Sequence, residues 1–139
     1  MLVGESPGRA HPRFPLFPSH GNSGDRLARA LDMTMDEFLG VFDRVNLLPN
    51  GPWLPRVAEA YAANLAACLL RRRDVVLLGR RVATAFGSGG SEYLVWTESS
   101  WGGRHVVVPH PSGRWYNDEI NLARVRDKSW HTWSQQTGK

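Results

Sequence analysis

Short apolar runs along the chain alternate with segments whose apolar residues recur at helical spacing. Runs of this length, bounded by turn residues, are typical of buried strands in an α/β protein. The predicted strands are Leu2–Val3, Arg44–Pro49, Asp74–Gly79 and Arg104–Val108. A weaker run at residues 93–96 either pairs with the last strand as a hairpin across Gly102 and Gly103 or is a loop.

Helices are predicted between and after these runs. They are Ser23–Leu31, a segment that begins with a capping box at Thr34 and Glu37, Pro55–Arg73, Arg80–Phe86, and a terminal helix that Asn117 caps and that contains Ile120, Ala123 and Trp130. The longest one has an apolar face of Val57, Tyr61, Leu65, Cys68 and Leu69. Its last three residues are arginines, which we expect to complement the helix dipole; a phosphate contact is the alternative.

The alternation of strands and helices predicts a mostly parallel sheet with helices on both faces, and ligands bind such sheets at the carboxyl ends of the strands. A length of 139 residues is enough for one core, so we expect a single domain spanning residues 1–139. Residues 9–24 lack a period and are rich in proline, histidine, glycine and serine, and we expect an ordered surface excursion there.

The composition limits the possible classes of protein. The 42% apolar and 22% charged residues are ordinary for a globular protein. The sequence opens without a basic or apolar leader and has one cysteine, Cys68, so we expect a cytoplasmic protein without an internal disulfide. The histidines lack the spacing of a metal site, and we expect neither a metal nor another cofactor. The 17 basic residues are nearly all arginines, which fits nucleic-acid binding and coding bias equally well.

Polar segments stand at the predicted carboxyl ends of three strands. They are Glu5–Ser6, Asn46 and His110–Ser112. Because parallel strands end at the same edge of a sheet, these segments are expected to converge on one site. Each has a simpler reading as well: a turn for the first, a cap for Asn46, and a structural histidine for His110.

The same segments resemble the sequence motifs of a known family. Val3–Gly8, with the sequence VGESPG, resembles the first motif of the uracil-DNA glycosylase superfamily, nearest to its GEAPG form. In the family's order, residues 46–49 resemble its asparagine strand, residues 77–79 its penultimate core strand, and Pro109–Ser112 its second motif. The resemblance implies a three-layer α/β/α sandwich around a mainly parallel, four-stranded sheet.

It also implies roles for the converging residues. His110 would donate a hydrogen bond to a carbonyl oxygen of the departing pyrimidine. Asn46 would read the edge of the flipped base, beside a loop formed by Gly4, Pro7 and Gly8. Phe17 is the candidate ring that stacks on the base, with Phe14 as the alternative.

Two positions of the first motif bear on the substrate. Glu5 would orient water or stabilise the cationic sugar; its alternative role is accepting hydrogen bonds within the loop. Ser6 stands where the most uracil-specific branch has a water-activating aspartate, and Gly8 where that branch has a tyrosine that excludes thymine. The substrate is therefore expected to be uracil or a 5-substituted pyrimidine. The nearest branch holds an iron–sulfur cluster on four cysteines, and one cysteine cannot hold it.

The last resemblance concerns the DNA itself. Ser112, Gly113, Arg114 and Trp115 resemble the loop that enters the minor groove, although a turn with an exposed arginine and a buried tryptophan is the alternative. We therefore expect a monofunctional DNA glycosylase, with no suitably placed lysine for lyase chemistry. The alternatives are a DNA- or base-binding protein without catalysis, and a glycosidase that acts on free nucleotides. No membrane or obligate protein partner is expected.

Overall fold

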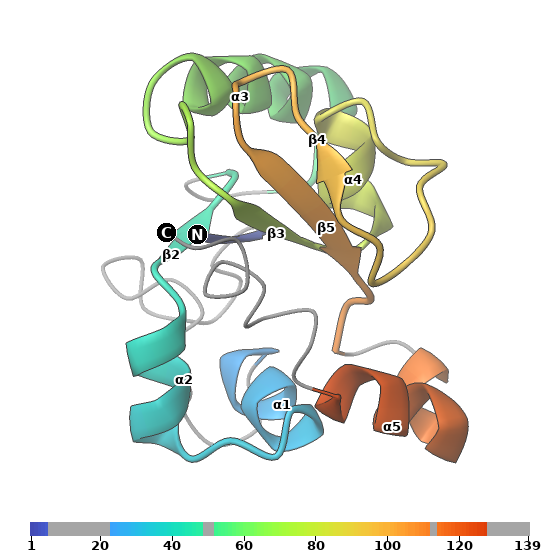
Figure 1. The fold of residues 1–139 in the computed structure, drawn as a ribbon. Helices are drawn as coiled ribbons and strands as arrows, with labels where there is room; N and C mark the ends of the chain where they lie inside the picture. The colour runs from blue at the N-terminus through green and yellow to red at the C-terminus, as the bar shows by residue number, and fades with distance from the viewer. Residues whose placement is uncertain (6–22, 49–51, 112–113, 128–139) are drawn as a thin grey trace.

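The structure is a computed structural model that describes residues 1–5, 23–48, 52–111 and 114–127. In these residues an α/β fold is built on a five-stranded mixed sheet in the order β2-β1-β3-β5-β4 (Figure 1). The strands are β1 (Leu2–Gly4), β2 (Arg44–Asn46), β3 (Val75–Leu78), β4 (Thr97–Glu98) and β5 (Arg104–Val108). The helices are α1 (Ser23–Ala30), α2 (Met35–Val41), α3 (Pro55–Ala67), α4 (Arg80–Ala85), the 3₁₀ turn η1 (Arg114–Asn117) and α5 (Glu119–Arg126).

Four of the strands run parallel, and β4 is antiparallel to β5. The apolar runs predicted as strands are thus confirmed. The fifth strand is an addition to the expected four: the hairpin forms, but it uses Thr97–Glu98 in place of residues 93–96, of which Tyr93 makes an isolated bridge to Val107. Both residues of β4 are exposed, so no apolar pattern marks it in the sequence.

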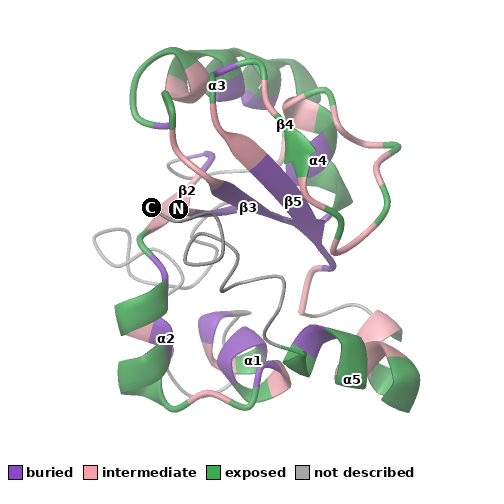
Figure 2. Ribbon diagram, viewed as in Figure 1, coloured by how far each residue is buried: buried purple, intermediate pink, exposed green. Residues whose placement is uncertain are grey.

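One face of the sheet packs on α1, α2 and α5. Leu2, Val76, Leu78, Val106 and Val108 contribute the sheet side of this core. The helix side comes from Leu27, Ala28, Leu31, Phe38, Phe42 and Val125. Figure 2 shows the buried positions of these helices turned toward the sheet, with exposed positions outward. Along β1, β3 and β5, residues of this core alternate with residues that face the other side, as a sheet covered on both faces requires.

The capping box at the start of α2 is confirmed. The Thr34 side chain accepts a hydrogen bond from the Glu37 backbone N–H, and the Glu37 side chain accepts one from the Thr34 N–H, each at 3.2 Å. These bonds satisfy backbone donors that have no partner inside the helix. Phe38 follows directly and is completely buried, so the cap fixes where this helix enters the core.

The opposite face packs on α3 and α4. Val3, Val75, Leu77 and Val107 face a group that includes Ala58 and Ala62 of α3 and Val82 and Ala83 of α4. The buried stripe of α3 therefore consists of alanines. Of the predicted face, Leu65 packs against this core, but the rest was wrong: Val57, Tyr61 and Leu69 are 40%, 41% and 44% exposed, and Cys68 is exposed. Val57 and Tyr61 each neighbour a buried alanine on the helix, and the small side chains let α3 approach closely, whereas a sequence pattern gives more weight to the larger residues.

Helix α3 also ends earlier than predicted, at Ala67 instead of Arg73. The chain turns so that Leu70 is buried, and the Arg72 N–H then donates to the Trp101 carbonyl at 2.8 Å. The Trp101 indole donates to the Arg73 carbonyl at 3.0 Å. The arginines at 71–73 thus lie beyond the helix and not in its last turn, so the dipole interpretation was wrong.

Helix α5 begins one residue later than predicted. Asp118, and not Asn117, is its N-cap: the carboxylate accepts hydrogen bonds from the N–H groups of Ile120 and Asn121. Of the three residues expected in this helix, Ile120 is 74% exposed, Ala123 is also exposed, and Trp130 lies outside the described residues. Val125 provides the buried contact of the helix. None of the helices in the described part of the chain has the length and apolar character needed to cross a bilayer.

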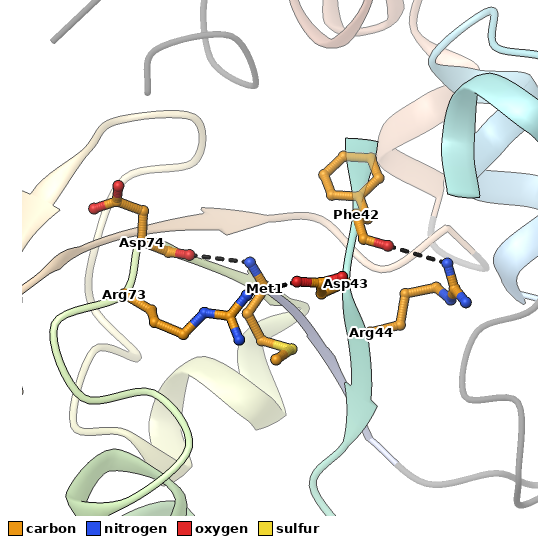
Figure 3. Close-up of polar contacts among 6 residues, drawn as sticks. All are labelled: Met1, Phe42, Asp43, Arg44, Arg73 and Asp74. Atoms are coloured by element: carbon orange, nitrogen blue, oxygen red, sulfur yellow. Dashed lines mark hydrogen bonds and ion pairs between the residues drawn. The ribbon is translucent and has the colours of Figure 1, made fainter. Parts of the chain in front are cut away.

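Polar contacts hold the amino edge of the sheet together (Figure 3). The Met1 amine donates to the Asp74 carbonyl at 3.1 Å, joining β1 to the start of β3. The Arg73 guanidinium donates to the Asp43 carboxylate at 2.6 Å, which joins the approach to β3 to the approach to β2. This hydrogen bond is the main cause of the lowered pKa of Asp43. These contacts therefore fix the beginnings of the strands to one another. The predicted site residues Glu5, Asn46 and His110 lie at the opposite edge, where the parallel strands end.

Candidate active site at the carboxyl edge of the sheet

The residues predicted at strand ends lie along one edge of the sheet. In the parallel register, Asn46 of β2 is the partner of Gly4 of β1. The pairing continues past both strands, because Leu47 N–H donates to the Gly4 carbonyl at 2.7 Å and Leu48 N–H to the Glu5 carbonyl at 2.8 Å. Glu5 and Asn46 are both half-buried there. This backbone pairing fixes the start of the first motif beside the asparagine strand.

His110 reaches the same edge from β5. Gly79, the residue after β3, donates from its N–H to the Val108 carbonyl at 2.7 Å, so the pairing of these strands also extends past β3. A Cβ on Gly79 would lie 3.2 Å from the His110 Cβ and 3.7 Å from its Cδ2. Gly79 has a φ of +92°, a conformation that side chains other than glycine rarely adopt. The glycine therefore provides the space in which His110 packs.

Tyr116 holds the segment that precedes His110. Its hydroxyl donates to the carbonyl of Pro109 at 2.6 Å. Burial raises the pKa of Tyr116 above its ordinary value, so the hydroxyl keeps its proton and acts as a donor. Because Pro109 is itself buried, the backbone on the amino side of His110 is fixed by both packing and hydrogen bonding.

The charged neighbours of the site come from different elements. Glu5 Oε1 lies 3.6 Å from an Nη of Arg81, in α4. The Glu5 side chain is 24% exposed and that of Arg81 is 63% exposed, so the ion pair spans the boundary between the site and solvent. Arg26, in α1, is the second arginine close enough to act on His110. Among the described residues, the edge thus combines the Glu5 carboxylate, the His110 imidazole and guanidinium groups from helices on both faces of the sheet.

Burial is the largest cause of the lowered pKa of His110. Arg26 and Arg81 lower it further by like-charge repulsion, and Glu5 acts in the opposite direction. Since the ordinary pKa is 6.5, the imidazole is neutral at physiological pH. A neutral imidazole carries one N–H donor and one acceptor nitrogen. His110 can therefore donate a hydrogen bond without carrying a charge into the site.

Asn46 and His110 stand at opposite sides of this edge. Two strands, β1 and β3, separate β2 from β5. With strands about 4.8 Å apart, the two backbones are on the order of 14 Å apart. A ligand that meets both side chains must lie across the ends of β1 and β3, where Gly4, Glu5 and Gly79 are found.

Six of the predicted site residues lie outside the described residues: Ser6, Pro7, Gly8, Phe17, Ser112 and Gly113. Of the proposed DNA loop, Arg114 and Trp115 are in η1. Arg114 is exposed, and Trp115 is half-buried, with ring centroids 5.9 Å from Tyr93 and 5.1 Å from Tyr116. Their part in binding DNA stays a prediction.

Three residues of the edge were not predicted as site residues: Gly79, Arg26 and Arg81. Gly79 has a sequence signal, because it follows the strongest apolar strand and precedes a helix, where a special backbone conformation is common. The two arginines have none, since nothing in the sequence separates them from the many others. The described residues contain no group of three histidine, cysteine or acidic side chains that could hold a metal ion.

Comparison with known proteins identifies no family for this chain. The chain matches no protein-family model, and no curated protein matches it.

Proposed function

We propose that this protein is a DNA glycosylase that hydrolyses the N-glycosidic bond of uracil or a 5-substituted pyrimidine in DNA and leaves an abasic site. The observation that supports it best is that Glu5 and His110, from opposite ends of the sequence, both lie at the carboxyl edge of the sheet, where the Glu5 charge acts on the pKa of His110. A carboxylate and a neutral imidazole on one edge match the two charges that develop when a base leaves a sugar.

The proposal includes the finer fold assignment. The parallel strands β2, β1, β3 and β5, with helices on both faces, support a sandwich of the uracil-DNA glycosylase type, to which the antiparallel β4 is an addition. The order of the motif residues along the chain supports it as well. Fold alone does not specify a reaction, so the activity rests on the edge residues.

In the proposed reaction, the bond between C1′ and the ring nitrogen breaks and its electron pair leaves with the base. The N–H of His110 donates to the base oxygen on which negative charge develops. Water adds its hydroxyl to C1′, and its proton passes to solvent or to the departing base. Because His110 is neutral, it stabilises the anion by hydrogen bonding and need not lose its proton.

Glu5 acts on the sugar side. Its carboxylate stabilises positive character at C1′ and orients the attacking water. Arg81 lies against Oε1, so we assign the water to Oε2. This arrangement gives Arg81 a positioning role for the carboxylate.

Base release is the test. Single- and double-stranded oligonucleotides with uracil or a series of 5-substituted pyrimidines are incubated with the protein, and released bases are identified by mass spectrometry. We expect release by the native chain, and a loss of roughly 100-fold or more in His110→Ala and Glu5→Gln. Arg56→Gln, an exposed change on α3, is the matched surface control.

Two outcomes contradict the proposal. DNA binding without release of any base indicates a binding protein of this fold. Release from free nucleotides at the same rate as from oligonucleotides indicates a nucleotide glycosidase.

A further inference from the structure

A groove with a volume of about 200 Å³ lies beside the candidate active site. Residues of α3, α4 and the segment before α3 line it: Trp53, Pro55, Glu59, Arg80, Arg81, Thr84 and Ala85. The lining combines the aromatic Trp53 and apolar residues with two arginines, one hydroxyl residue and one carboxylate residue. No part of the reaction proposed above uses this groove as a binding site.

Arg81 connects the groove to the active-site edge. Arg81 is one of the lining residues, and its guanidinium lies 3.6 Å from Glu5 Oε1. A molecule in the groove is therefore next to the carboxylate assigned to the reacting sugar. A ligand that occupies both places would pass Arg81 on its way from Glu5 into the groove, as two neighbouring units of one chain would.

The two arginines of the groove differ in what they can bind. The Arg80 guanidinium donates to the carbonyls of Gly89 and Ser91 and lies 4.0 Å from the ring centroid of Tyr93. Both hydrogen bonds come from Nη1, and together with the ring contact they hold this guanidinium against the protein. Arg81 is 63% exposed, and its ion pair with Glu5 engages only part of a group with five N–H donors. Arg81 is thus the cation that an incoming anion meets.

The size and the charges of the groove limit the ligand. Pockets for drug-sized ligands have volumes of about 300–1,000 Å³, so this groove holds one ring system and not a complete nucleotide. Trp53 offers an aromatic surface for that ring, and Arg81 a cation for a phosphate outside the groove. Glu59, the one carboxylate among the described lining residues, would accept from an exocyclic amino group of a base.

We propose that this groove binds the nucleotide next to the reacting one, with its base against Trp53 and the connecting phosphate on Arg81. The inference rests on the proposed function and deepens it, because it makes the substrate a single-stranded or locally opened nucleic-acid chain. An aromatic ring beside a phosphate-binding cation is the combination with which proteins hold single strands. Because the Glu59 carboxylate accepts hydrogen bonds, it favours cytosine or adenine, which carry an exocyclic amino donor, over thymine in the groove.

The first test measures binding alone. The affinity of the full chain for a fluorescein-labelled oligodeoxycytidine is measured by anisotropy, for the native protein and Trp53→Leu. Stacking of one base on an aromatic side chain is worth enough that its loss should weaken binding roughly ten-fold. Trp53→Phe keeps a ring and should restore most of the affinity. Tyr61→Leu removes an aromatic ring from the exposed side of α3 and should change nothing.

A second variant avoids any effect on the core. Thr84 is exposed and lines the groove, so Thr84→Leu narrows the groove and should weaken oligonucleotide binding as Trp53→Leu does. Because the Thr84 side chain also lies against Gly89, the unfolding midpoint of this variant is measured beside its affinity. Native affinity in both Trp53→Leu and Thr84→Leu would overturn the proposal. Competition by an oligo-aspartate peptide as strong as that by unlabelled oligodeoxycytidine would also overturn it, in favour of an acidic peptide.

Turnover separates this inference from the function on which it rests. With uracil-containing oligonucleotides, Trp53→Leu should raise KM and leave kcat nearly unchanged, because the groove binds a neighbour of the reacting unit. If Trp53→Leu turns over substrate with an unchanged KM, the proposed nucleotide binding in the groove is contradicted, and the glycosylase proposal is not. If oligonucleotide binding depends on Trp53 but no base is released, the proposed glycosylase activity is contradicted, and the binding role of the groove is not.

Discussion

The side chain of His110 packs against the backbone of Gly79, where an added Cβ would lie 3.2 Å from the His110 Cβ. Gly79 has φ +92° and ψ 162°, a region of backbone conformation that is nearly restricted to glycine. It also donates to Val108 in the strand that leads to the histidine. The position of the imidazole thus depends on a residue with no functional group.

Replacing this glycine is the first prediction. Gly79→Ala should lower the free energy of unfolding by about 1–3 kcal/mol, because alanine is strained in this conformation. Base release should fall as well, since the methyl group displaces His110. Gly40→Ala is the matched control: position 40 lies in α2, has no heavy atom within 4 Å of an added Cβ, and should gain stability from higher helix propensity. Urea unfolding of both variants measures the difference, and equal effects would contradict the steric argument.

The cap of α2 gives a second prediction. Thr34→Ala removes the hydroxyl that accepts from Glu37 N–H, and with it one half of the capping box. We expect a loss of about 1 kcal/mol in the free energy of unfolding. Thr34→Ser keeps a hydroxyl and should recover most of it. If the serine variant were as destabilised as the alanine variant, packing of the threonine methyl and not the cap would be the cause.

A third prediction concerns pH. Burial lowers the pKa of His105 and of His110 below the ordinary value of 6.5. Between the folded and unfolded pKa values the unfolded chain binds more protons, so the stability of the folded state rises with pH there. The contribution of these neutral histidines to the stability of the folded state is complete above their pKa in the unfolded chain. It falls as the pH decreases through about 6.5. The pKa of Asp43 is lowered from 3.8, so this carboxylate stays ionised in that range.

Urea midpoints measured from about pH 8 to about pH 5 should therefore decrease toward acid. His105 contributes through a site at the other end of β5, where Ser88 Oγ lies 2.9 Å from Nε2 and Ser99 Oγ lies 2.7 Å from Nδ1. His110→Gln should make the decrease smaller by removing one of the two histidines. A pH profile that is unchanged in this variant would show that His110 titrates alike in the folded and unfolded chain.

The apolar runs were sufficient to predict the parallel strands, because Leu2, Val76 and Val107 are buried whichever face they meet. The same argument failed on α3, where packing distance and not hydrophobicity decides that Ala58 is buried and Val57 exposed. Glu5, Asn46 and His110 were predictable as strand ends on one edge. The charges around them were not, since Arg26 and Arg81 belong to helices whose rotation only tertiary packing fixes.

The last prediction tests that charge arrangement directly. Glu5 raises the pKa of His110, whereas Arg26 and Arg81 lower it. Removing each charge should therefore shift the pKa of His110 in a known direction. The pKa should fall in Glu5→Gln and rise in Arg26→Gln and Arg81→Gln. Titration of the imidazole C–H signals by NMR measures these shifts in the folded protein, with His110→Gln to assign the resonance.

Arg56→Gln removes an exposed arginine from α3 and serves as the control, because Arg56 is not among the charges that act on His110. Its His110 pKa should equal that of the native chain. A shift in Arg56→Gln as large as in Arg81→Gln would mean that net charge and not proximity sets the titration. An unchanged pKa in Glu5→Gln would separate Glu5 from His110 and remove the main support for their joint action on one substrate.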